Sequence, residues 1–501
     1  MNAIEDEMNV SITENGAIGY KTTKHSLLDM NFKVASYRKK TDFEILADWH
    51  LAYSEDPVMA IKWLFYARDV RGGLGERRLF RVIFNDLATN NSTVAKKLLK
   101  LIAEYGRYDD LVVLYDVPAV KKDVVKIIYE TLSSDVDKMN SDKSITLLAK
   151  WLPSINTSNN EVVARANKLA KDLELTPRQY RKTLSALRKY LAVVETKMSA
   201  KEWAEINYEA VPSNANVKYN NAFLRNDEER RRAYLGALEK GEAKINSSVL
   251  YPHDIVNKYM ACGGWYSSVK STKDAALEAM WKGLPNLCTE NTIVVADGSG
   301  SMTSKVSGNI SALDVANALA IYMAEHCTGE FHNKYITFSS RPQFVKLPGT
   351  SLRDNLMEAC RHNECSNTNI EATFDLILQT AVNNKMSQED LPKNVLIISD
   401  MEFDSASRCG YYGKPNASLF ATIERKFKNA GYKMPRLIFW NVNSRTCTIP
   451  VKENELGVAL VSGFSVNIVK MVMGNSLDPY ELLCEILNGE RYVPVAEALK
   501  E

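Results

Sequence analysis

The stretch TIVVADGSGSM at residues 292–302 decides the fold of the C-terminal part of this chain. It is apolar over Ile293–Ala296 and then turns polar, a pattern that predicts a buried strand ending in a tight turn. The two glycines of the turn let the backbone fold closely, so the side chains of Asp297, Ser299 and Ser301 are expected to converge beyond the strand. Carboxylate and hydroxyl oxygens suit a hard cation such as Mg²⁺, which makes this turn a candidate metal-binding loop.

From about residue 286 onward, short apolar runs alternate with amphipathic segments of helical period. The expected strands are Ile293–Ala296, Tyr335–Phe338, Val395–Ser399 and Leu437–Trp440, and the expected helices are Ala312–Glu325, Ile370–Ala381, Leu419–Ala430, Val466–Met473 and Tyr480–Leu487. This alternation predicts parallel strands joined by crossover helices, a doubly wound α/β domain over residues 286–501. Ligands of such sheets bind beyond the carboxyl ends of the strands, where the strand order reverses.

A second buried strand, Val395–Ser399, ends at an acidic residue in the same way, at Asp400. Between the two strands, Thr368 stands directly before a predicted helix and offers a hydroxyl from a third loop, with Thr373 nearby as an alternative. The predicted metal site therefore consists of Asp297, Ser299, Ser301, Thr368 and Asp400.

Two of these segments resemble known motifs. DGSGS at residues 297–301 resembles the D-x-S-x-S signature of von Willebrand A domains and their metal-ion-dependent adhesion site. IISDMEFD at residues 397–404 resembles the fourth-strand segment of that family, which ends in a metal-site aspartate. The third segment departs from the family pattern, because Ser366 and Asn367 stand where glycines usually precede the threonine.

The resemblance implies roles for the five residues. Ser299 and Ser301 would bind Mg²⁺, or another divalent cation such as Mn²⁺, directly, with Thr368 joining from the middle loop. Asp297 and Asp400 would act largely through water molecules. An open coordination position would accept an acidic or polar group from a partner.

Other interpretations of the glycine-rich turn fit less well, although an ordinary strand-to-helix turn stays possible. The segment GSGSMTSK at residues 298–305 lacks the glycine before lysine that a Walker loop requires. It also lacks the third glycine of a dinucleotide-binding fingerprint and the spaced glycines of a nucleophile elbow. The six histidines are scattered and form no visible triad, so we expect no enzymatic activity.

The first part of the chain, residues 1–285, reads as an α-helical array. Apolar residues recur at helical spacing, and Gly, Pro and Asn separate the segments. The expected helices are Val58–Arg68, Glu76–Ala88, Thr93–Glu104, Lys121–Ser133, Ile145–Leu152, Glu161–Leu173 and Pro177–Glu195, with a further helix opened by Asn226–Arg232. No repeat of fixed period is visible, so any repeated units have diverged.

The helix that begins at Pro177 is expected to be capped by Thr176 and to have a strongly basic face. Its leucines recur on one side, and five cations fall on the other: Arg178, Arg181, Lys182, Arg188 and Lys189. Such a face is either a solvated outer surface or a stripe that binds phosphates.

Two further segments combine glycine, arginine and tyrosine. RDVRGGLGERR at residues 68–78 is either a phosphate-holding loop before a helix or a tight helix–helix turn with its arginines paired to acids. Its candidate contacts are Arg68, Arg71, Arg77 and Arg78. EYGRYDDL at residues 104–111 places Arg107 between two tyrosines, which could stack on bases or pack between helices.

These helical segments carry a second resemblance, which covers nearly the whole chain. RDVRGGLGERRLF, YGRYDDL and LTPRQYRKTLSALRKYL look like an uncharacterised family, a domain of unknown function found in bacteria, phages, large viruses and eukaryotes. That family is similar in architecture to the Ro autoantigen proteins, the TROVE-module RNA binders. Those proteins join HEAT-like helical repeats to a von Willebrand A domain and bind single-stranded and small structured RNA.

The resemblances imply a non-enzymatic RNA-binding scaffold with a divalent-metal site for partner binding. The alternative is a metal-dependent protein interaction module that captures an acidic partner and has no role with RNA. Composition excludes little, because 45% hydrophobic and 25% charged residues are ordinary for a globular protein and the net charge is only +2. No apolar window is long enough for a membrane span, and the eight cysteines form no CxxC pair, which favours a cytoplasmic protein with reduced thiols.

Overall fold

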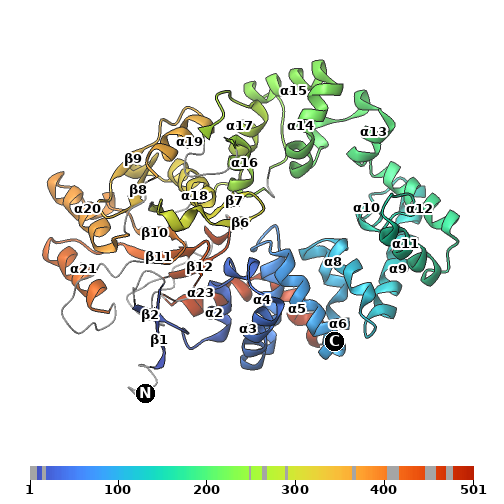
Figure 1. Cartoon of the computed structure of the whole chain (residues 1–501), viewed down its shortest axis with the longest axis horizontal. Coiled ribbons are helices and arrows are strands. Elements are labelled where there is room, and N and C mark those ends of the chain that lie inside the picture. The colour runs from blue at the N-terminus through green and yellow to red at the C-terminus, as the bar shows by residue number, and fades with distance from the viewer. Residues whose placement is uncertain are drawn as a thin grey trace. The chain divides into compact units, whose positions relative to one another are not determined.

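The structure is a computed structural model of the whole chain. It describes residues 8–13, 18–247, 250–261, 268–287, 291–363, 368–402, 417–445, 449, 459–465, 467–469 and 478–500. These residues form two compact units (Figure 1). The sheet unit contains Met1–Ala60 and Ser247–Gly489, and the helical unit contains Ile61–Asn246 and Glu490–Glu501. These bounds differ from the predicted domains, 1–285 and 286–501, because each unit includes a segment from the other end of the chain.

The sheet unit is built on a six-stranded sheet of order β12-β11-β10-β5-β8-β9. The strands are β5 (Thr292–Asp297), β8 (Lys334–Phe338), β9 (Phe344–Lys346), β10 (Asn394–Ser399), β11 (Arg436–Asn441) and β12 (Ala459–Ser462). Five are parallel, and β9 pairs antiparallel with β8 at the edge. Counted along the chain this is the order 3-2-1-4-5-6 of a doubly wound sheet, so the order reverses between β5 and β10.

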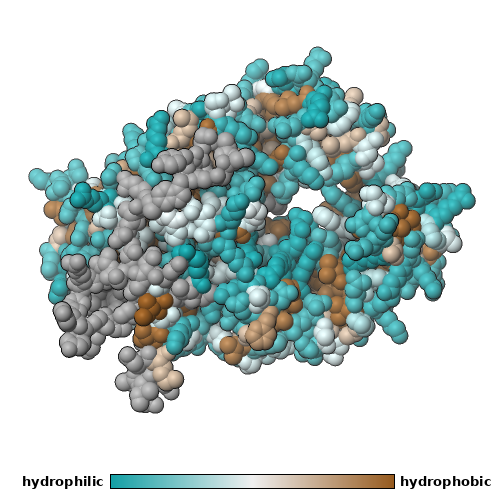
Figure 2. Space-filling view, in the orientation of Figure 1, coloured by the Kyte–Doolittle hydropathy of each residue, from teal (hydrophilic) through white to brown (hydrophobic). Residues whose placement is uncertain are grey.

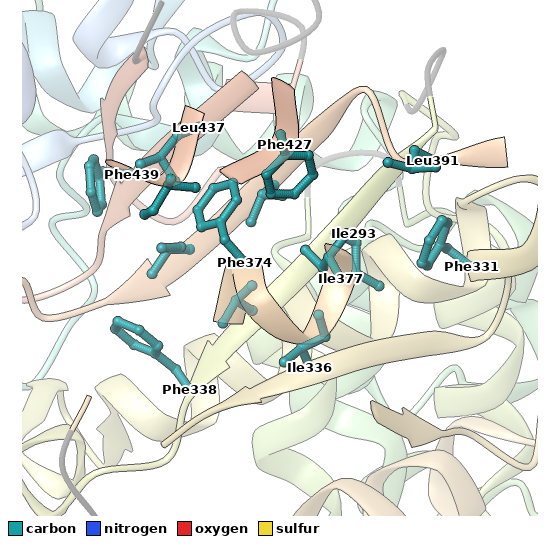
Figure 3. Close-up of a cluster of buried hydrophobic side chains, with 14 of the residues drawn as sticks. Ile293, Phe331, Ile336, Phe338, Phe374, Ile377, Leu391, Phe427, Leu437 and Phe439 are labelled. Atoms are coloured by element: carbon teal, nitrogen blue, oxygen red, sulfur yellow. The ribbon is translucent and has the colours of Figure 1, made fainter. Parts of the chain in front are cut away.

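Both faces of this sheet are buried, as expected for central parallel strands. Figure 3 shows one face, where side chains of β5, β8 and β11 pack against Phe374 and Ile377 of α20 (Ile370–Asn383) and Phe427 of α21 (Ala417–Asn429). The other face is covered by α18 (Ala312–His326), which contacts β5, β8 and β10. The predicted doubly wound α/β arrangement is therefore confirmed.

The predicted strands and helices of this region all occur within a few residues of their expected bounds, except that Val466–Met473 lies mostly outside the described residues. Two edge strands, β9 and β12, were not predicted. The sheet unit also contains β1 (Val10–Ile12), β2 (Ile18–Tyr20), α2 (Ser26–Phe32), α3 (Asp42–Glu55), α16 (Pro252–Tyr259), β3 (Met260–Ala261), β4 (Ser268–Val269), α17 (Ala275–Lys282), β6 (Lys305–Ser307), β7 (Ile310–Ser311), α19 (Leu352–Arg361) and α23 (Pro479–Leu487).

The helical unit follows the chain as a succession of short helices, and this confirms the expected helical array (Figure 1). They are α4 (Pro57–Arg68, of which Pro57–Ala60 belong to the sheet unit), α5 (Arg77–Asn90), α6 (Ser92–Leu98), α7 (Ile102–Tyr105), α8 (Tyr108–Val113), α9 (Lys121–Asn140), α10 (Leu148–Trp151), α11 (Asn160–Asp172), α12 (Pro177–Tyr190), α13 (Val194–Ala200), α14 (Ser213–Asn226), α15 (Glu228–Lys240) and α24 (Val493–Lys500). Thr176 and Gln179 form the expected cap of α12, with Pro177 at its first position.

Candidate functional site

Asp297 and Asp400 meet where the strand order of the sheet reverses. β5 and β10 are neighbouring parallel strands, and Ala296 is in register with Ile398, so Asp297, the last residue of β5, and Asp400, which follows β10, lie at the same carboxyl-terminal edge. The two residues are 2% and 1% exposed. The structure therefore brings together the two carboxylates that the sequence predicted for one site.

The carboxylate of Asp297 organises the turn that follows β5. Its Oδ1 accepts the backbone N–H of Ser299 at 2.8 Å, and its Oδ2 accepts the hydroxyl of Ser399 at 2.6 Å. The hydroxyl oxygens of Ser299 and Ser301 lie 3.1 Å apart. Ser399 was not among the predicted residues, although its position before Asp400 and beside β5 is the signal that could have found it.

Asp400 has a carboxylate oxygen, Oδ2, that accepts no hydrogen bond from the described residues. Its Oδ1 accepts the backbone N–H of Glu402 at 3.3 Å. Burial, and then the negative charge of Asp297, raises the pKa of Asp400 far above the usual range of a carboxyl, and a hydrogen bond from Ser301 opposes that rise. Two buried carboxylates in one site favour binding of a cation that neutralises both.

Thr368 and Thr373 were alternatives for the third loop, and their environments differ. Thr373 is fully buried, and its hydroxyl donates to the carbonyl oxygen of Asn369 at 2.9 Å, within α20. Thr368 is 7% exposed and precedes α20, whose first turn is capped by Asn369. Thr368 therefore stays the candidate at the end of the third loop, whereas Thr373 is enclosed within the domain. Ser366 and Asn367 lie outside the described residues.

The sequence did not single out two cations that act on Asp400: Arg445 lies beside it, and Lys39 is near enough to interact with it electrostatically. The Nη2 atom of Arg445 is 3.7 Å from Oδ2 of Asp400, and the arginine side chain is 34% exposed. Lys39 is exposed on the segment after α2. Burial, and then the charge of Arg445, lowers the pKa of Lys39, whereas the charge of Asp400 opposes that change. No local pattern connects these cations to the site, because one lies more than 350 residues from Asp400 in the sequence.

The side chains at this sheet edge offer oxygen donors, which fit a hard divalent cation. Among the residues that the structure describes, no group of three or more His, Cys, Asp and Glu side chains could hold a metal ion. At this sheet edge the candidate donors are the carboxylates of Asp297 and Asp400 and the hydroxyls of Ser299 and Ser301. Oxygen donors of this kind suit Mg²⁺ or Mn²⁺.

The glycine-rich segment 68–78 is a tight turn between α4 and α5, one of its two predicted alternatives. Its backbone N–H groups are used inside the turn, where Leu74 donates to the carbonyl oxygen of Tyr66 at 3.0 Å and Glu76 donates to that of Ala67 at 2.7 Å. A side chain at Gly73 would place its Cβ 2.0 Å from the Tyr66 oxygen. These N–H groups are not available to hold phosphate.

Arg68 is a structural residue, which corrects its assignment to a nucleic-acid surface. It is 1% exposed, and its Nε and Nη2 atoms lie 2.8 and 2.7 Å from Oδ2 of Asp110. Arg81 pairs with the other oxygen of Asp110 at 2.6 Å. The remaining candidates of the segment, Arg71, Arg77 and Arg78, are exposed.

The segment 104–111 also contributes mainly to packing. Tyr105 is 2% exposed, stacks on Tyr492 at a centroid distance of 5.7 Å and donates its hydroxyl to the carbonyl oxygen of Arg491. Arg107 is half-buried, with its guanidinium 5.1 Å from the centre of the Trp151 ring, and burial lowers its pKa. The tyrosine is therefore not available to stack on a base.

The basic face of α12 is largely confirmed as an exposed surface. Arg178, Arg181, Lys182 and Lys189 are exposed and make no hydrogen bond or ion pair with other described residues. The prediction was wrong for Arg188, because its guanidinium donates to the carbonyl oxygens of Ala149 and Leu152 at 2.8 Å each. Hydrophilic residues predominate over this end of the helical unit (Figure 2).

Within the described residues, no helix has the length and apolar character that crossing a bilayer requires.

Comparisons with known proteins place the chain in a family. Residues 158–290 match the family model "Domain of unknown function (DUF2828)", and residues 291–485 match "Domain of unknown function (DUF7788)". The crystal structure of the Deinococcus radiodurans RO (RSR) protein is similar over 81% of this chain and 93% of that chain, with 13% identity and a TM-score of 0.35. "Uncharacterized protein L728" of Acanthamoeba polyphaga mimivirus is 30% identical over 97% of this chain and 88% of its own length. The chain therefore belongs to the same family as this viral protein, which confirms the expected membership of an uncharacterised family.

Proposed function

We propose that this chain is a non-enzymatic scaffold that binds RNA on the basic face of α12. The observation that carries the proposal is the set of four exposed cations on that face, none of which has a partner among the described residues. Arg178 and Lys189 are eleven residues apart, so the cations extend along roughly 16 Å of helix. No acidic residue occurs within Pro177–Tyr190 to neutralise them.

This arrangement suits a phosphate backbone better than a compact ligand. Exposed lysines and arginines that meet phosphates release condensed counterions, which gives binding that depends on salt and little on sequence. The four cations have no internal ion pairs to break, so their charges are fully available to a polyanion. The RNA would be small and structured or single-stranded.

A second role is favoured by the cluster at the sheet edge. We propose that the sheet unit is a von Willebrand A-type domain and that Asp297, Ser299, Ser301, Thr368 and Asp400 hold Mg²⁺ or another divalent cation. The bound ion would offer a coordination position to an acidic group of a protein partner. The open Oδ2 oxygen of Asp400 and the hydroxyl pair of Ser299 and Ser301 support this proposal.

The RNA-binding role is tested by exchanging the four cations for glutamine, as Arg178→Gln, Arg181→Gln, Lys182→Gln and Lys189→Gln. A matched control exchanges four exposed lysines elsewhere in the helical unit, as Lys100→Gln, Lys122→Gln, Lys126→Gln and Lys240→Gln, with the same loss of charge. Affinity for a fluorescent RNA hairpin and a single-stranded RNA is measured between 50 and 200 mM salt, a range of about fourfold in concentration. We expect the α12 variant to bind at least roughly tenfold more weakly, with a salt slope reduced by up to about 3. Equal loss in both variants, or no binding by the wild type at low salt, contradicts the proposal.

The metal site is tested separately with Mg²⁺ alone. The wild type should bind the ion in calorimetry and unfold at a higher temperature in its presence, because binding to the folded state alone adds stability. Asp297→Asn should abolish both effects and leave RNA affinity unchanged. Loss of RNA binding with a chelator indicates that the two roles are not separate.

A further inference from the structure

Arg445 is positioned to act on the candidate metal site from outside the predicted ligand set. The Nη2 atom of its guanidinium lies 3.7 Å from the Oδ2 oxygen of Asp400. That oxygen accepts no hydrogen bond from the described residues, and Asp400 is 1% exposed. The arginine thus faces the carboxylate oxygen that is best placed to meet a bound cation.

The backbone around Arg445 is fixed by a hydrogen-bonded turn after β11. The side chain of Asn441 accepts the backbone N–H of Ser444 at 2.8 Å, and the carboxylate of Glu402 accepts that of Arg445 at 2.8 Å. Both acceptors are buried. The side chain therefore starts from a defined point at the sheet edge, while its one-third exposure leaves a path toward solvent.

A second cation is held at the same edge by the segment after α2. The hydroxyl of Ser36 donates to the carbonyl oxygen of Ser444 at 2.7 Å, and the backbone N–H of Ala35 donates to the hydroxyl of Ser462 at 3.0 Å. These bonds bring Lys39 close enough to Arg445 and Asp400 to interact electrostatically with both. The ammonium of Lys39 has no hydrogen-bond or ion-pair partner among the described residues.

We propose that Arg445 is a resident counter-ion that competes with the divalent cation for Asp400, with Lys39 adding to the same effect from a greater distance. In the metal-free protein its charge stabilises the buried carboxylate. A divalent ion at Asp297 and Asp400 is repelled by the guanidinium, so the arginine lowers metal affinity and must move toward solvent as the ion binds. This inference rests on the proposed metal site and adds a means of setting its affinity.

The size of the effect follows from charge and distance. A unit charge a few ångströms from a divalent ion interacts by several kcal/mol at the effective dielectric constant of a protein surface, and partial exposure reduces this strongly. We therefore expect Arg445→Gln to bind Mg²⁺ roughly tenfold more tightly than the wild type. Arg445→Lys keeps the charge and should stay within about threefold of the wild type. Lys39→Gln should show a smaller gain in the same direction.

The experiment is calorimetric titration of the full chain with MgCl₂, with the Mg²⁺-dependent rise in unfolding temperature as a second measurement. Arg425→Gln is the matched control, because Arg425 is an exposed arginine of the same unit on α21. Tighter binding by Arg445→Gln, with Arg445→Lys and Arg425→Gln near the wild type, supports the proposal. Equal or weaker binding by a folded Arg445→Gln overturns this proposal and leaves the metal site standing. Absence of Mg²⁺ binding in every variant, the wild type included, overturns the metal site and this inference with it.

Discussion

Replacing Asp110 with asparagine tests whether the arginines of segment 68–78 are structural. The side chain of Asp110 is fully buried and meets two arginines, Arg68 and Arg81, at distances between 2.6 and 2.8 Å. It also accepts the backbone N–H of Arg107 at 3.1 Å. The substitution Asp110→Asn keeps the shape of the side chain and removes its negative charge.

The expected loss of stability can be worked out from the two arginines separately. Arg68 is 1% exposed and has no path to water, so the substitution leaves its charge buried without a full counter-charge. Breaking a buried ion pair in this way costs about 3–5 kcal/mol. Arg81 is 27% exposed and keeps Asp109 at 2.8 Å, so its share is under about 1 kcal/mol. Because the asparagine oxygen still accepts hydrogen bonds, we expect a total loss of about 3 kcal/mol, near the lower bound for a buried pair.

Urea unfolding of the full chain, followed by circular dichroism, measures this loss in the transition of the helical unit. Glu104→Gln is the control, because Glu104 is 63% exposed and lies 3.8 Å from both Arg71 and Arg491, exposed pairs that are expected to contribute under about 1 kcal/mol together. If Asp110→Asn destabilises the unit no more than the control does, the structural role given to Arg68 is refuted.

Two further predictions concern single buried positions. Burial, and then the charge of Arg38, lowers the pKa of His253 to about 3 from an ordinary value of 6.5, so the folded protein keeps this histidine neutral while the unfolded chain takes up a proton below about pH 6.5. The free energy of unfolding of the wild type should therefore decrease by about 2 kcal/mol through this histidine as the pH falls from 6.5 to 5. In His253→Phe, urea unfolding at the two pH values should show a decrease that is smaller than that of the wild type by about this amount. Gly73→Ala should lower stability by about 1–3 kcal/mol because its Cβ would lie 2.0 Å from the Tyr66 oxygen. Gly236→Ala is the control, because its Cβ meets nothing within 4 Å and the variant should be neutral or slightly stabilising. Urea unfolding measures both glycine variants.

Much of the sheet could be predicted because each central strand is a short apolar run that ends in a polar turn. Val395–Ser399 and Leu437–Trp440 are examples, and the structure extends each of them by only one or two residues. The pairing of Asp297 with Asp400 was predictable for a related reason, since both follow strands whose carboxyl ends share one edge. Local sequence carries this information because strand direction and burial are properties of consecutive residues.

The remaining features depend on contacts between distant segments, which local patterns do not encode. β9 is three residues long and β12 four, too short for periodicity to distinguish them from loops. Arg68 was a candidate contact of the glycine-rich segment and Arg188 of the basic face of α12, but buried acceptors on other elements hold both. Lys39 and Arg445 reach the site only through the fold.

Because each unit contains segments from both ends of the chain, a single cut cannot produce two intact fragments. The core of the sheet includes Phe32, which is 1% exposed, and the side chain of Asn441 donates to the Phe32 carbonyl oxygen at 2.9 Å. In the helical unit, Arg491 donates to Asp69 through two nitrogen atoms, and Tyr492 packs against Tyr105. A cut at residue 285 therefore removes the core side chain of Phe32 from the fragment that contains the sheet, a loss of several kcal/mol. In the helical unit it separates Asp69 from Arg491, a pair that contributes less because the arginine is 34% exposed. Since a domain is stable by only about 5–15 kcal/mol, binding by either unit is best measured in the full chain.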